Sequence, residues 1–144
     1  MVEPASGRSG RLIRSLYAIC LLAAASTHAY ALIQHGVFWD YGGAPFASAV
    51  FWTSLTVLDP AAATLLLLAR RSGVVLTVAI IVVDVVHNAF FAASDLIARH
   101  AAFDLLQNWM LTSQVVFMGF VLATVSTAWP RGRDPGPMPA WIRR

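Results

Sequence analysis

Four long apolar segments alternate with short polar connections along the chain, at about residues 16–34, 46–69, 73–93 and 105–129. A helix needs about 20 residues to cross ~30 Å of hydrocarbon, and each segment is close to that length or longer. The pattern therefore predicts an all-α integral membrane protein, a four-transmembrane-helix bundle. We expect one membrane domain over residues 1–144, with polar tails at 1–13 and 130–144.

Composition agrees with this prediction, because 58% of the residues are hydrophobic. The basic residues are all arginines, which is typical of a GC-rich bacterial genome. Nine of them flank the segments on one side: Arg8, Arg11, Arg14, Arg70, Arg71, Arg131, Arg133, Arg143 and Arg144. Arginine accumulates in cytoplasmic loops, so we expect the bacterial inner membrane with both termini cytoplasmic (N-in/C-in). The arginines form no continuous basic surface, and we expect no nucleic acid partner.

The first segment leaves an alternative open. Its basic start, apolar middle and the small-x-small sequence Ala29-Tyr30-Ala31 also fit a cleaved signal peptide. We favour a retained helix because apolar residues continue through Ile33. The single cysteine, Cys20, excludes an intramolecular disulfide.

Two aspartates interrupt the second and third segments. Asp59 lies eleven residues before Arg70, and Asp84 lies eleven residues after Gly73. If "RRSG" is a tight turn, both carboxylates lie ~16 Å from the same membrane boundary on adjacent antiparallel helices. A charge at that depth costs about 2.5–3.5 kcal/mol, so we expect the aspartates to be partnered, hydrated or protonated.

Other polar residues fall at similar depth and form, with the aspartates, a predicted polar layer. His87 and Asn88 follow Asp84 by three and four residues and share its helix face. His28 in the first segment and Gln114 in the fourth reach a similar height. We predict a ligand- or proton-binding site made of Asp59, Asp84, His87, Asn88, His28 and Gln114.

The pair Asp59-Pro60 has three interpretations. Proline removes a backbone donor and kinks or breaks a helix, and aspartate before proline is a typical N-cap pair. The favoured interpretation makes Asp59 the cap of a second half-helix. Binding of a ligand or proton, or a salt link to a histidine, are the alternatives.

For Asp84, His87 and Asn88, simple interhelical hydrogen bonding competes with a binding or catalytic pocket. Metal or haem ligation is a minority interpretation, with His28 and His87 as the two haem ligands. No recognised metal spacing is present, so we predict no metal and no cofactor. His35, Asp40, His100 and Asp104 fall in or near the outer connections, where we expect solvated side chains. Trp39, Trp52, Trp109 and Trp129 are expected to be interface anchors.

No family signature is complete, but the layout has a loose likeness to EXPERA-domain proteins. These four-helix membrane proteins include sterol isomerases and sterol-binding proteins. The resemblance rests on four spans with cytoplasmic ends, acidic and histidine residues within them, and the acid-proline pair in "LDPAAA". The longer polar loop after the first span of that family is missing here. The resemblance implies that lipid chemistry belongs among the alternatives.

The leading functional hypothesis is a polar pocket that binds a small amphipathic ligand or conducts protons or ions. One alternative is a non-catalytic accessory subunit of a larger membrane complex. Another is a lipid-modifying enzyme with isomerase-like acid–base chemistry, in which an aspartate and a histidine act as acid and base. Membrane lipids are expected partners in every case. Whether the chain is an enzyme stays open.

Overall fold

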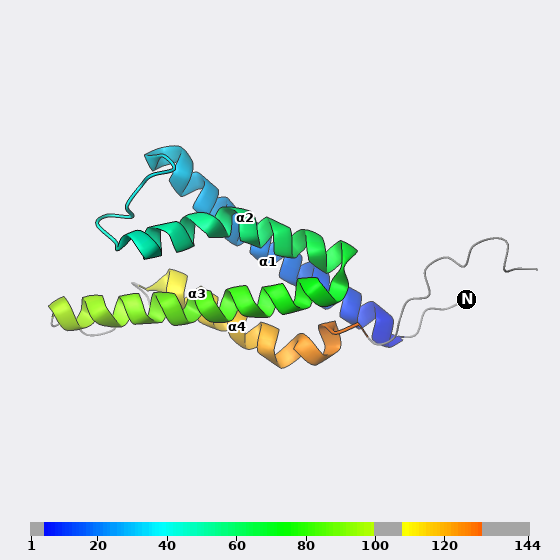
Figure 1. Ribbon diagram of the computed structural model, residues 1–144. Helices are drawn as coiled ribbons and strands as arrows, with labels where there is room; N and C mark the ends of the chain where they lie inside the picture. Colours follow the sequence, from blue (N-terminus) through cyan, green and yellow to red (C-terminus); the bar gives the residue numbers. More distant parts are fainter. Residues whose placement is uncertain (1–4, 100–107, 131–144) are drawn as a thin grey trace, which may run out of the picture.

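The computed structural model describes residues 5–99 and 108–130, and this part of the chain is helical without strands (Figure 1). The four helices are α1 (Ala5–His35), α2 (Phe46–Leu68), α3 (Arg70–Arg99) and α4 (Trp109–Ala128). Each is long and apolar enough to cross a membrane. The predicted number and class of helices are confirmed.

Two helices are longer than predicted, because a helical backbone satisfies its own hydrogen bonds and continues into polar flanks. α1 begins at Ala5 instead of residue 16, and α3 covers Arg70–Arg99 instead of 73–93. α2 agrees with its predicted segment to within one residue. The start of the fourth predicted segment (105–107), His100, Asp104 and the tail beyond residue 130 lie outside the described residues.

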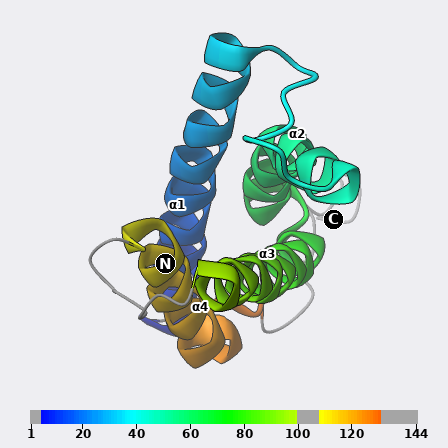
Figure 2. The same cartoon turned by 90° about the vertical axis from the view of Figure 1, so that its left-hand side faces the viewer.

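The helices form a ring in chain order, each packed on the next, and α4 closes it against α1 (Figure 2). The start of α1, the end of α4 and the connection between α2 and α3 lie at one end of the bundle, here called the junction end (Figure 1). The connection from α1 to α2 lies at the opposite end.

The junction between α2 and α3 is a single residue, Ala69, so the predicted helical hairpin is confirmed and is tighter than expected. Gly73 permits this turn. A Cβ atom at Gly73 would lie 2.5 Å from the carbonyl carbon of Leu65 and closer still to the nitrogen of Leu66. A side chain there would therefore collide with the α2 backbone, which cannot move aside as a flexible side chain can.

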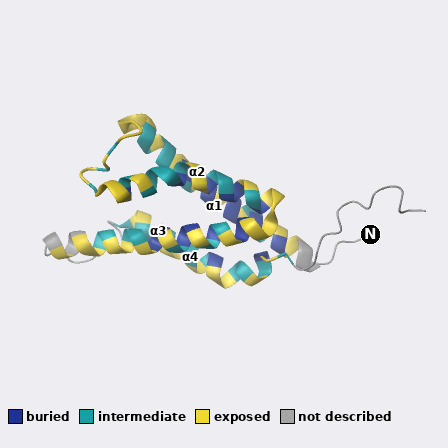
Figure 3. Ribbon diagram, in the orientation of Figure 1, coloured by how far each residue is buried: buried dark blue, intermediate teal, exposed yellow. Residues whose placement is uncertain are grey.

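Buried side chains concentrate toward the junction end (Figure 3). Along each helix away from the junction end, the last of these buried residues is Ala25 on α1, Val85 on α3 and Val121 on α4. Ser48 on α2 is also buried, although it lies further from the junction end than these residues. The half of the bundle on the junction side of these residues is called the packed half. Large apolar residues are exposed on the outer surface of both halves, for example Leu68 in the packed half and Phe90 beyond it.

Two hydrogen-bonded side chains join α1 to α4 in the packed half. The Tyr17 hydroxyl donates to the carbonyl of Val121 at 3.0 Å and lies 2.6 Å from the Thr124 hydroxyl. The ring of Tyr17 packs edge-on against Phe117 and Phe120. The Arg14 guanidinium donates to the carbonyl of Ala128 at 2.8 Å, and a cation at a helix C-terminus is electrostatically favourable. Arg14 is thus a structural residue as well as one of the flanking arginines.

The close approach at Gly73 generates a test with a matched glycine. Gly73→Ala is expected to lower the stability of the purified protein by about 1–3 kcal/mol, the usual effect of overpacking. Gly119→Ala on α4 meets nothing within 4 Å and is expected to be neutral or slightly stabilising, since alanine favours helices. Thermal unfolding in detergent compares the two. Equal stability of both variants would contradict the proposed contact.

Candidate functional site at the α2–α3 interface

The acid pair, Asp59 and Asp84, lies between α2 and α3. Asp59 is 2% exposed and Asp84 is 7% exposed, and the two carboxylates interact electrostatically. Asp59 lies ten residues before Ala69 and Asp84 lies fifteen residues after it, so Asp84 lies further from the junction end than Asp59. The structure therefore places both aspartates at the α2–α3 interface, but not at the equal depth that the sequence predicts, because the predicted turn over RRSG is the first turn of α3.

Asn88 joins three helices around this pair. Its amide nitrogen donates to Asp84 Oδ1 at 2.7 Å and to Gln114 Oε1 on α4 at 3.1 Å. Its amide oxygen accepts a 2.8 Å hydrogen bond from the indole nitrogen of Trp52 on α2. These four residues are called the Asn88 network. Three of them, Asp84, Asn88 and Gln114, are among the six predicted site residues. Each hydrogen-bonding atom named in this paragraph has a partner within the network.

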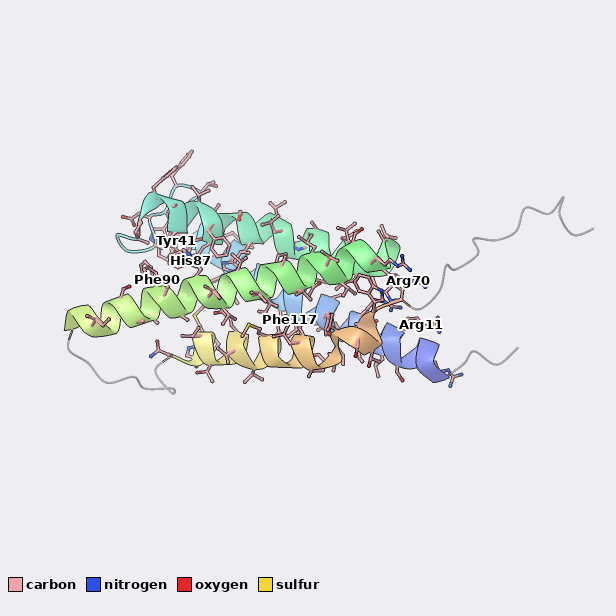
Figure 4. All side chains as sticks on the ribbon, turned by 60° about the horizontal axis from the view of Figure 1, so that its bottom comes forward. Arg11, Tyr41, Arg70, His87, Phe90 and Phe117 are labelled. Atoms are coloured by element: carbon pink, nitrogen blue, oxygen red, sulfur yellow. The ribbon has the colours of Figure 1, made fainter. Side chains whose placement is uncertain are left out.

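His87 lies among aromatic rings one turn further from the junction end than Asp84. Its ring centroid is 4.8 Å from that of Phe51 and 5.4 Å from that of Trp52. Figure 4 shows His87 and Tyr41 on the same side of the bundle, far from the labelled arginines Arg11 and Arg70. The imidazole therefore lies against two aromatic rings of α2.

Within the part of the chain that the structure describes, three buried polar atoms at this interface have no hydrogen-bond partner: Thr56 Oγ1, Asp59 Oδ1 and His87 Nε2. They are called the unpartnered set. Thr56 precedes Asp59 by one helical turn on α2, and His87 follows Asp84 by one turn on α3. An unsatisfied buried polar group typically costs about 1–3 kcal/mol, so three at one interface call for an explanation.

A continuous series of ring contacts connects the site to the α1–α2 connection. His35 stacks on Trp39, Trp39 stacks on Tyr41, and Tyr41 contacts Trp52, with centroid distances of 4.0, 4.4 and 5.1 Å. Tyr41 has a φ of 53°, which is uncommon for a residue other than glycine. The backbone nitrogen of the next residue, Gly42, donates to Asp40 Oδ1 at 3.1 Å. This turn directs the Tyr41 ring back onto α2.

The prediction that Asp59 caps a half-helix is wrong. α2 is one continuous helix from Phe46 to Leu68 with Pro60 inside it, and Asp59 Oδ1 accepts no hydrogen bond. Proline removes a single backbone hydrogen bond, whereas a broken helix would leave several backbone groups unsatisfied in apolar surroundings. The Asp59 carboxylate is consequently not occupied by backbone donors.

Trp52 and His28 differ most from expectation. Trp52 was predicted to be an interface anchor, but it lines the site through its hydrogen bond to Asn88 and its contact with His87. A signal for this was present, because Trp52, Thr56 and Asp59 lie on one helix face. His28 is half-buried and continues the stripe of Leu21 and Ala25 on α1, and within the described residues it forms no hydrogen bond or ring contact with the other site residues. The sequence did not predict that Phe51 and Tyr41 would lie at the site.

Metal ligation gains no support at this site. Among the residues that the structure describes, no group of three or more histidine, cysteine, aspartate or glutamate side chains is arranged to hold a metal ion. The suggested haem pair of His28 and His87 stays a sequence-based prediction. The chemistry available is that of two carboxylates, an imidazole and a hydroxyl enclosed by aromatic rings.

The Asn88 network generates a stability prediction. Asn88→Leu keeps a similar volume but removes three hydrogen bonds and leaves Trp52 and Gln114 without their partner. Two of these bonds join different helices, at about 0.6 kcal/mol each, and the third lies within α3, so we expect a loss of roughly 1–2 kcal/mol. Ser94→Ala is the control on the same helix, because the Ser94 hydroxyl bonds only the carbonyl of Phe90. A thermal midpoint for Asn88→Leu equal to that of the control would refute the network's structural role.

Comparison with known proteins yields no relative. No protein-family model, no curated protein and no solved structure matches this chain. The resemblance to EXPERA-domain proteins therefore stays an expectation from the sequence, and the function has to be argued from the site itself.

Proposed function

We propose that this chain is a bacterial inner-membrane protein that binds a small amphipathic molecule between α2 and α3. Four helices of membrane-spanning length support the location, and the arginine distribution supports cytoplasmic termini. The binding site comprises the acid pair, the unpartnered set and the rings of Phe51 and Trp52. In the proposed orientation the junction end faces the cytoplasm and the site opens toward the other side.

The observation that carries this proposal is the unpartnered set. Simple interhelical hydrogen bonding accounts for the Asn88 network, where each bonded group has a partner on the same or a neighbouring helix. It does not account for Thr56, Asp59 and His87, which contribute no hydrogen bond between helices through their buried atoms. Buried polar atoms kept without protein partners are typical of groups that bind something else.

The position of the site within the bundle supports the same function. The acid pair lies where the packed half ends, so buried side chains surround the site more fully on the junction side than on the opposite side. Large apolar side chains beyond it, such as Tyr30 and Phe90, are exposed. An amphipathic molecule would place its polar group at the carboxylates and its apolar part among these side chains.

A subunit role is the second candidate, and α4 favours it. Only Val121 and Ala128 are buried among the described residues of this helix, and Gly119 faces open space. A helix so little covered by its own chain suits contact with another membrane protein as well as with lipid. This role and ligand binding are not exclusive, because α4 and the unpartnered set lie on different parts of the bundle.

Orientation is testable with reporter fusions. A C-terminal green fluorescent protein fusion is expected to fluoresce, and a C-terminal alkaline phosphatase fusion is expected to be inactive, because both reporters would be cytoplasmic. Phosphatase fused after Gly43, in the α1–α2 connection, is expected to be active. The reverse pattern would show that the termini lie outside and would overturn the proposed orientation.

Ligand binding is testable by native mass spectrometry of protein purified in a mild maltoside detergent. We expect a non-covalently bound small molecule on the wild type that is at least tenfold depleted in the double variant Asp59→Asn/Asp84→Asn. Asp40→Asn removes an exposed carboxylate in the α1–α2 connection and is expected to retain the bound mass. A wild-type chain that carries no small molecule would refute the proposal, and an additional protein chain would favour the subunit role.

A further inference from the structure

The charge of the site is unbalanced, and this bears on the kind of molecule that it binds. Within the described residues neither member of the acid pair forms an ion pair, and Asp84 instead accepts a hydrogen bond from the neutral amide of Asn88. Arg70 lies eleven residues from Asp59 and fourteen from Asp84, or ~16 and ~21 Å along the helices. The Arg14 guanidinium binds the carbonyl of Ala128 at the end of α4.

The surroundings of the acid pair are aromatic. Trp52 contacts Tyr41, His87 and Phe91 through ring centroids 5.1–5.4 Å apart, and Phe51 contacts His87 from the same helix as Trp52. The faces of such rings carry partial negative charge and attract cations, most strongly for tryptophan. The carboxylates and the aromatic faces of this site therefore both favour a positively charged ligand.

We propose that the bound molecule is a small lipophilic cation, a substituted ammonium group attached to an apolar body. This inference rests on the proposed function and specifies its ligand class. The ammonium group lies between Asp59 and Asp84, where Asp59 Oδ1 has no protein partner. The apolar body extends away from the junction end along Phe51 and Trp52.

Other ligand classes fit less well. An anion would be repelled by the two carboxylates. A neutral molecule would supply hydrogen bonds to the unpartnered set but would supply no counter-charge to a buried carboxylate. A divalent metal ion prefers several oxygen ligands, and the described residues offer no group of three acidic or histidine side chains for it.

The test uses two soluble probes of similar size and opposite charge, benzyltrimethylammonium and benzylsulfonate. Isothermal titration of the full chain in a non-ionic maltoside is expected to show saturable 1:1 binding of the cation, at least tenfold tighter than any binding of the anion. Asp59→Asn is expected to weaken cation binding at least tenfold. Phe51→Leu, which removes a ring but no hydrogen bond, is expected to weaken it several-fold, and Asp40→Asn is expected to leave it unchanged.

The outcomes separate this inference from the proposed function. Equal binding of both probes, no binding of either, or cation binding unaffected by Asp59→Asn would overturn the inference. The proposed function would survive those results if the native mass spectra show a neutral or anionic molecule lost with the acid pair. The comparison of the two probes on the wild type requires no variant to fold.

Discussion

The register between α2 and α3 is the constraint on which the rest of the site depends. Gly73 lets the two backbones approach until no side chain fits between them, and this fixes how the residues of one helix face those of the other. Asp59 and Asp84 are both buried at this interface, and two turns further along α2 Trp52 reaches Asn88 and His87. A different spacing at the junction would move every one of these contacts, because helical residues on one face recur only every three or four positions.

The bundle combines a rigid half with a half that its own side chains cover sparsely. Tyr17 and Arg14 bind α1 to the last turns of α4, and both side chains are almost fully buried. The site lies at the end of this packed half, so its carboxylates are held by well-packed helices while its outer wall consists of rings and exposed apolar residues. Such an arrangement positions charge accurately and still admits an apolar group of variable shape.

The sequence predicted the helices, because they follow from the lengths of the apolar segments, but it placed the acid pair at one depth by assuming a turn over RRSG, where α3 has already begun. It also placed Asp84 and Asn88 on one face and Gln114 at their height, which the Asn88 network confirms. It could not predict which polar groups would find partners, since that depends on how each helix is rotated about its axis. Helices that are apolar on most sides give little periodic signal for this rotation. The continuity of α2 through Pro60 and the inward position of Trp52 were missed for the same reason: both are decided by packing between helices.

The one-residue connection at Ala69 also determines how the site can change its width. Two helices joined so closely cannot separate at that end, and any opening between them is a rotation about the junction. The displacement of each residue then grows with its distance from Ala69. Ser94 lies 25 residues from Ala69 and Asp84 lies fifteen, so for the same rotation the outer end of α3 moves farther than Asp84 by a factor of about 1.7. Small adjustments at the carboxylates are thereby amplified at the opposite end of the bundle.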